Sequence, residues 1–151
     1  MEEKVMEAST DSVRIEVTLS APLEAVWKAW TQPDQVTQWW GSDPNGKGVS
    51  ARMDVRQGGL FEISFVDGDQ TEHTCSGVYR EVIESQKLSF TWSWKSEPGV
   101  ESLVTLEMTP ENNFTRVLFL HEHLGTGSQH NYLQGWKSTF QKLEQMLVKR
   151  K

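Results

Sequence analysis

The segment Gly135–Leu147, GWKSTFQKLEQML, carries the clearest periodic pattern in the chain. Its large apolar residues recur at steps of three and four, which places them on one face of a helix. They are Trp136, Phe140, Leu143 and Leu147. With Tyr132 and Leu133 continuing the pattern, we predict a helix from about Ser128 to about Val148, roughly 30 Å long. Because such a helix spans a small domain, the rest of the chain must be arranged around it.

Alternating apolar and polar residues before this helix predict an antiparallel sheet. In VRIEVTL (13–19) and KLSFTWSW (87–94) every second residue is apolar, as in a strand with one buried face. Further strands are expected over 49–55, 61–65, 71–83, 103–109 and 114–123. Two short helices are predicted after the first strand, one in APLEAVWKAWT (21–31) and one opened by Thr31 and Pro33.

The predicted order is a strand, two short helices, about six strands and a long helix, which defines an α+β domain. Because sheets twist, the strands are expected to curl around the long helix, leaving an interior that is either filled by large side chains or hollow. A chain of 151 residues fits one domain. We assign residues 13–151 to it and interpret the polar start MEEKVMEASTDS (1–12) as a flexible N-terminal tail.

Composition narrows the possible functions. The formal net charge of −6 argues against nucleic-acid binding, which needs clustered Lys and Arg. No apolar run is long enough for a signal peptide or a membrane span. Cys75 is the single cysteine, so neither an internal disulfide nor a multi-cysteine zinc site is expected. Together these observations favour a cytoplasmic protein that does not act on membranes.

Four strings in the expected order carry a family resemblance: APLEAVWKAWTQPDQVTQWW (21–40), DVRQGG (54–59), KLSFTWSW (87–94) and GWKSTFQKLEQML (135–147). The sequence resembles the activator of 90-kDa heat-shock-protein ATPase homologue (AHSA-like) family, within the START/Bet v-like superfamily, also called SRPBCC. The resemblance implies a helix-grip fold, in which a curved sheet wraps a long C-terminal helix around an internal pocket. It implies no single activity, because relatives include lipid carriers, hormone binders, polyketide cyclases and a co-chaperone domain.

Aromatic residues dominate the faces that should meet between sheet and helix. The candidate ligand-binding residues are Phe61, Phe65, Trp92, Trp94, Leu106, Phe119, His121, Tyr132 and Trp136. Such side chains either fill the interior or line a groove for a small apolar or aromatic molecule. Trp94 and Tyr132 stand nearest the expected mouth of the groove and are the better pocket candidates. We therefore predict binding of a small hydrophobic ligand, with no cofactor.

Two other functions and one further partner remain open. In a polyketide-cyclase-like enzyme, His121 and Tyr132 would position and protonate a ring-closing substrate. In a co-chaperone-like interaction module, an exposed surface would bind a chaperone. Separately, Leu118 and Leu120 make the second face of the last strand apolar, which predicts cover by a short helix or by the other subunit of a homodimer.

A metal site is not expected. His121 and His123 in LHEH should share one face of the last strand by its period of two. A metal needs three or more converging ligands, and no spacing rule selects a third one among His73, Cys75 and His130.

Overall fold

The computed structural model describes residues 2–125 and 131–149. Its elements follow in the order β1 (Glu2–Ala8), β2 (Val13–Leu19), α1 (Leu23–Thr31), α2 (Pro33–Val36), β3 (Lys47–Met53), β4 (Leu60–Val66), β5 (Glu72–Ile83), β6 (Lys87–Trp94), β7 (Ser102–Glu111), β8 (Phe114–Glu122) and α3 (Tyr132–Lys149). The strands form one eight-stranded sheet in the order β1-β2-β8-β7-β6-β5-β4-β3. Each described pair of neighbouring strands is antiparallel.

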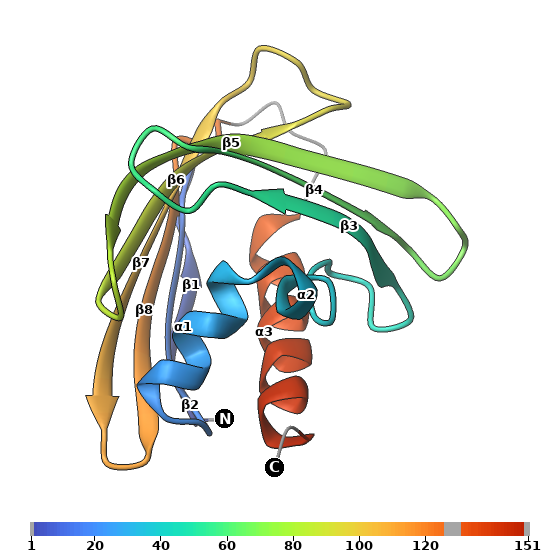
Figure 1. The fold of residues 1–151 in the computed structure, drawn as a ribbon. Coiled ribbons are helices and arrows are strands. Elements are labelled where there is room, and N and C mark those ends of the chain that lie inside the picture. The colour runs from blue at the N-terminus through green and yellow to red at the C-terminus, as the bar shows by residue number, and fades with distance from the viewer. Residues whose placement is uncertain (1, 126–130, 150–151) are drawn as a thin grey trace.

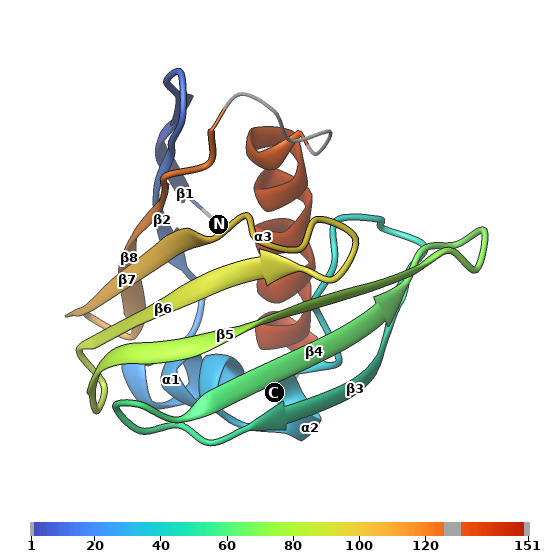
Figure 2. The same ribbon diagram turned by 90° about the horizontal axis from the view of Figure 1, so that it is seen from above.

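The sheet is strongly curved, and α3 lies on its concave side (Figure 1, Figure 2). In Figure 1 the strands β3, β4 and β5 pass over one end of α3, whereas β1, β2, β7 and β8 stand alongside it. The short helices α1 and α2 lie on the same concave side. The predicted α+β helix-grip architecture is confirmed, and it encloses an interior between the sheet and α3.

The N-terminal residues form a strand instead of the flexible tail predicted from their polar composition. Glu2–Ala8 make β1, which pairs with β2 from Glu2 opposite Thr18 to Ala8 opposite Val13. Because β8 occupies the other side of β2, β1 satisfies backbone groups that would otherwise lie at an open edge. Met6 packs against the core from this strand. Pairing with a neighbouring strand, which composition does not report, decides the structure here.

The long helix has the buried face that its periodicity predicts. Trp136, Phe140, Leu143 and Leu147 are all buried. The described helix begins at Tyr132, and the predicted start near Ser128 lies outside the described residues. Asn131 caps the helix, because its Oδ1 accepts a hydrogen bond of 3.2 Å from the backbone N–H of Gln134.

Aromatic side chains fill most of the interior. The ring of Trp30 on α1 lies 4.6 Å from that of Trp39, centroid to centroid, and 6.5 Å from that of Trp136 on α3. Trp136 in turn packs 4.5 Å from Phe119 on β8. The indole N–H of Trp39 donates a 3.0 Å hydrogen bond to the carbonyl of Ala29. Most of the tryptophans therefore pack the core. A ligand can bind only in the part of the interior that these side chains do not fill.

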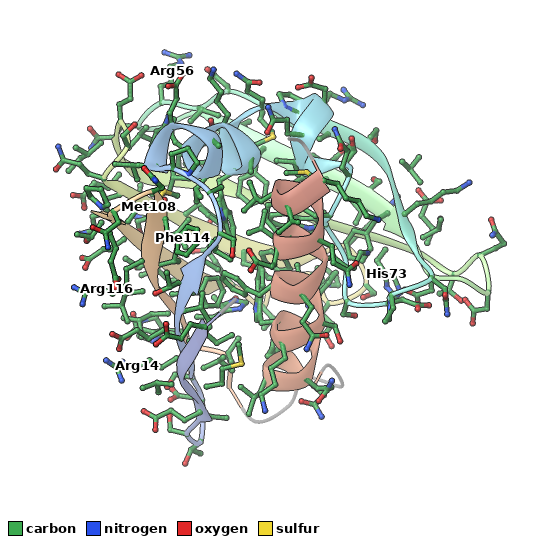
Figure 3. The ribbon with its side chains drawn as sticks, turned by 90° about the horizontal axis from the view of Figure 1, so that it is seen from below. Arg14, Arg56, His73, Met108, Phe114 and Arg116 are labelled. Atoms are coloured by element: carbon green, nitrogen blue, oxygen red, sulfur yellow. The ribbon has the colours of Figure 1, made fainter. Side chains whose placement is uncertain are left out.

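The outer face of the sheet is not covered by any of the described helices (Figure 1). Leu118 and Leu120 on β8 are half-buried there. Leu120 stands between Arg14 of β2 and Thr105 of β7. Figure 3 shows Arg14 and Arg116 projecting on this side, away from α3. The two leucines thus lie among charged and polar neighbours, without the short helix that was one of the two expected covers.

Candidate ligand-binding pocket

A pocket of about 110 Å³ opens at the N-terminal end of α3. Its walls come from the first turns of α3, the loop after α2, and strands β4, β5 and β6. The lining residues are Trp40, Gly41, Ser42, Phe65, His73, Trp92, Trp94, Asn131, Tyr132, Gly135, Trp136 and Thr139. Seven of them carry an aromatic or imidazole ring, and among the described lining residues there is no aliphatic side chain, carboxylate, Lys or Arg.

The mouth of the pocket is held together by polar and ring contacts. The indole N–H of Trp94 donates a 2.9 Å hydrogen bond to the hydroxyl oxygen of Tyr132, which joins the end of β6 to the start of α3. The rings of Phe65 and His73 each lie 6.0 Å from that of Trp94. His73 Nε2 is 2.8 Å from a carboxylate oxygen of Asp67, which orients the imidazole. His73, labelled in Figure 3, lines the pocket, so β5 supplies a polar group to this wall.

The loop after α2 is fastened to α3 and to the β4–β5 turn. Lys142 Nζ donates hydrogen bonds to the carbonyl oxygens of Gly41 at 3.2 Å and Asp43 at 3.1 Å. The Asp43 carboxylate accepts the backbone N–H of Gly68 at 2.8 Å, and this bond lowers the pKa of Asp43. Gly41 has φ +108°, and a Cβ there would come within 2.8 Å of the Phe65 ring. Glycine is therefore required where this loop approaches β4.

Gly135 in α3 has no comparable steric requirement. A Cβ at this position would lie 3.4 Å from Cβ of Ser42, an ordinary van der Waals contact. Glycine inside a helix costs roughly 0.8–1 kcal/mol relative to alanine. Because Gly135 lines the pocket, the missing side chain leaves open space between α3 and the loop at Ser42.

His121 belongs to the core beside the pocket and not to the pocket wall. It is 0% exposed. The indole N–H of Trp136 donates to His121 Nδ1 at 3.0 Å, so Nδ1 is unprotonated and Nε2–H donates to Oγ of Ser102 at 2.7 Å. The Ser102 hydroxyl then donates to the carbonyl of Trp92 at 3.3 Å. Burial lowers the pKa of His121 to about 3, so the ring is neutral and both nitrogens are engaged.

The structure brings five of the nine predicted site residues together. Phe65, Trp92, Trp94, Tyr132 and Trp136 line the pocket. The remaining four do not. Leu106, Phe119 and His121 are each 0% exposed in the core, and Phe61 packs against Tyr79 and Phe90 beside a void of only about 10 Å³. These four side chains point inward as alternation predicts, but they lie deep in the core, where neighbouring side chains fill the space around them.

Seven pocket residues were missed by the sequence reasoning: Trp40, Gly41, Ser42, His73, Asn131, Gly135 and Thr139. Most of them lie in the loop after α2 or on the first turns of α3, where two segments distant in sequence meet. The available signal was the pair Trp39–Trp40 followed at once by the turn-rich GSDPNGKG. Large rings next to such a loop indicate an aromatic surface at an edge of the core.

The described residues contain no group of three or more His, Cys, Asp or Glu side chains placed to hold a metal ion. His121 and His123 do not share a face, because β8 ends at Glu122 and His123, at φ +61°, is exposed. His130 lies outside the described residues. Cys75 is buried, and burial raises the pKa of its thiol, so the side chain behaves as an inert core group.

An antiparallel sheet closed around a C-terminal helix, with a pocket where that helix starts, defines a helix-grip protein. Residues 20–148 match the family described as Activator of Hsp90 ATPase homolog 1-like protein. The chain belongs to this family, as its four sequence strings predicted. The family and fold are those of ligand-binding or interaction modules in general. No match was found among curated proteins.

Solved structures share the fold. A crystal structure of a protein from Nitrosomonas europaea has a TM-score of 0.80 and 22% identity, covering 95% of this chain and 98% of its own. A solution structure from Arthrobacter aurescens has a TM-score of 0.84 and 16% identity, covering 96% and 91%. The AHSA1-like protein from Aeromonas hydrophila has a TM-score of 0.75 and 19% identity, covering 91% and 93%. At these identities the likeness concerns the fold. Among the described helices, none combines the length and hydrophobicity needed to cross a bilayer.

Proposed function

We propose that this protein binds a small aromatic or hydrophobic molecule, or the corresponding end of a larger one, in the pocket at the start of α3. The observation that carries the proposal is the ring-lined wall kept open beside Gly135, where alanine would fit and would strengthen the helix. Gly135 weakens its own helix although no neighbour excludes a side chain there. We explain this glycine by the pocket space that its missing side chain leaves open.

The size of the pocket limits the ligand. Its volume of about 110 Å³ is below the roughly 300 Å³ at which pockets for drug-sized molecules begin. The aromatic core occupies the rest of the interior, so a sterol or a fatty acid cannot be enclosed. One compact group fits inside, and the remainder of a larger ligand would extend through the mouth past the half-buried Trp94 and Tyr132.

Tryptophan emission and isothermal titration calorimetry test the proposal on the full chain. Small aromatic molecules such as phenol and indole are expected to quench emission saturably, because four tryptophans line the pocket. Gly135→Leu should abolish the saturable signal by filling the space near Ser42, while thermal unfolding shows that the variant is folded. Gly135→Ala is the matched control and should bind more weakly than wild type but measurably. Unchanged binding in Gly135→Leu would place the ligand elsewhere and end the proposal.

The polyketide-cyclase-like enzyme and the homodimer, both left open by the sequence, gain less support. The cyclase hypothesis assigned positioning and protonation of the substrate to His121 and Tyr132. Tyr132 lines the pocket, but both ring nitrogens of His121 already form hydrogen bonds, with Trp136 and Ser102. Interaction with a second copy through Leu118 and Leu120 is supported only by their half-buried position on a face without a covering helix. Light scattering of wild type and Leu120→Glu tests it, since a dimer that uses this face should become a folded monomer.

A further inference from the structure

We propose that the group bound in the pocket is a compact methylated ammonium, the cationic head of a quaternary or tertiary alkylamine. This inference rests on the proposed function and names the chemical class of its ligand. Three observations carry it: the composition of the wall, the angles between its rings, and the charges around its mouth.

The wall of the pocket differs from the rest of the interior. The core contains many aliphatic residues, including Ile15, Leu88 and Leu143, yet none of the described pocket residues is aliphatic. Four of them are tryptophans, the side chain whose electron-rich face attracts cations most strongly. A pocket for an alkyl chain needs no such selection, whereas an aromatic cage for a methylated ammonium does.

The tryptophan rings of the pocket meet one another mostly at large angles and do not form a slot for a flat molecule. Trp92 meets Trp94 at 84° and Trp136 at 62°, with centroids 5.2 and 5.5 Å apart. Trp40 meets Trp136 at 85°. The one nearly parallel pair among these four, Trp40 and Trp92 at 24°, has centroids only 5.7 Å apart, so no ring can enter between them. Walls at large angles suit a rounded group more than a planar one.

The volume agrees with this shape. The pocket, of about 110 Å³, holds one compact group such as a nitrogen with its methyl groups. The substituent of the ammonium would leave through the mouth.

Charges around the mouth favour a cation. Asp67 contacts the pocket residue His73, Asp69 interacts with His73 electrostatically, and Asp43 follows the lining residue Ser42. The ammonium of Lys142 is held by carbonyl oxygens and lies close to the carboxylates of Asp43 and Asp67. With Lys95, which follows the lining residue Trp94, three carboxylates stand against two ammonium groups, so the rim remains negative, in a chain of net charge −6.

The start of α3 opposes a cation only weakly. A helix N-terminus carries about half a positive charge, less than the excess of carboxylates at the rim. Asn131 already accepts one of the free backbone N–H groups of the first turn. No described Lys or Arg lines the pocket to bind an anion.

Choline and 3,3-dimethylbutan-1-ol provide the test, because they have the same shape and differ by the charged nitrogen. Calorimetry on the full chain should show choline binding about tenfold more tightly than the neutral alcohol, the order expected for a desolvated cation–π contact. The preference should fall as salt screens the rim. Trp94→Leu should remove most of the preference and Trp94→Phe should keep part of it. Trp27→Leu, a half-buried tryptophan of α1 outside the pocket, should leave it unchanged. If Trp94→Leu does not fold, Tyr132→Leu removes a neighbouring ring instead.

The outcomes separate this inference from the proposed function. Equal or tighter binding of the neutral alcohol overturns the cation preference but leaves a hydrophobic pocket. If choline does not bind while phenol or indole still does, the cation preference is likewise overturned and the hydrophobic pocket remains. If none of these molecules binds, both proposals fall. A choline preference that survives both Trp94→Leu and Tyr132→Leu refutes the aromatic cage as its cause.

Discussion

The indole N–H of Trp136 on α3 donates a 3.0 Å hydrogen bond to Nδ1 of His121 on β8, inside the core. This bond links the helix directly to the sheet that surrounds it. It exists only while Nδ1 is unprotonated, so the charge state of one buried histidine is tied to the packing of helix against sheet.

Acid should weaken the fold through His121. Burial lowers its pKa to about 3 in the folded protein from 6.5 in the unfolded chain, so between these values the unfolded state binds more protons. The free energy of unfolding should therefore fall as pH drops below about 6.5, by about 1.4 kcal/mol per pH unit from this group. Urea unfolding from pH 7.5 to 4.5 measures the slope. His121→Asn keeps an acceptor for Trp136 but cannot bind this proton. The slope of unfolding free energy against pH should therefore be smaller in this variant by the contribution of one proton, and equal slopes would contradict this account.

Truncation of Trp136 should cost far more stability than truncation of Trp94. Trp136 is 5% exposed and packs against Trp30 and Phe119, so Trp136→Ala should destabilise by roughly 3–5 kcal/mol. Trp94 is half-buried at the mouth, and Trp94→Ala should lose clearly less while weakening ligand binding. Denaturant titration with a ligand titration on each variant gives both quantities. Equal losses of stability would mean that Trp94 is a core residue.

Gly135→Ala should stabilise the protein. The new methyl group makes only an ordinary contact with Ser42, and alanine favours the helix by roughly 0.8–1 kcal/mol. The midpoint of urea unfolding should rise without a change in slope. A destabilised variant would show that Gly135 is required for packing, and the argument that it holds the pocket open would lose its basis.

Lys142→Met should weaken binding more than stability. The change keeps the apolar stem but removes the hydrogen bonds that fasten Gly41 and Asp43 to α3, which frees the loop forming one wall of the pocket. We expect a several-fold lower affinity for uncharged pocket ligands such as phenol and a small shift in the thermal midpoint. Lys149→Met, at the exposed end of the same helix, is the control and should behave as wild type.

Hydrogen exchange distinguishes the strand β1 from a flexible tail. In an antiparallel edge strand, alternate amides bond to the neighbour, so about every second amide over Glu2–Ala8 should be protected. The amides of Val13–Leu19 should be protected from both sides, because β2 pairs with β1 and β8. Uniform fast exchange over residues 2–8 would instead show that this segment is a flexible tail.

Local patterns alone determined the architecture. The three-and-four spacing from Trp136 to Leu147 predicts one buried helical face, and the alternation in 13–19 and 87–94 predicts strands with one inner face. These periods are properties of neighbouring residues, so they can be read without knowing what packs against them. The four family strings worked in the same way, since each belongs to one short segment. Trp94 and Tyr132 could be placed near a mouth because both stand at the ends of their elements.

Tertiary structure decided which inward residues touch open space. Phe119, His121 and Trp92 all point inward from their strands, but only Trp92 reaches the pocket, because depth depends on side chains contributed by other elements. Gly135 and Ser42, 93 residues apart by their numbers, form one wall only after α3 meets the loop that follows α2. Strand β1 likewise exists through its pairing with β2, which its polar sequence does not announce. Inward direction is a local property of the chain, whereas cavities and edges arise from contacts between distant segments.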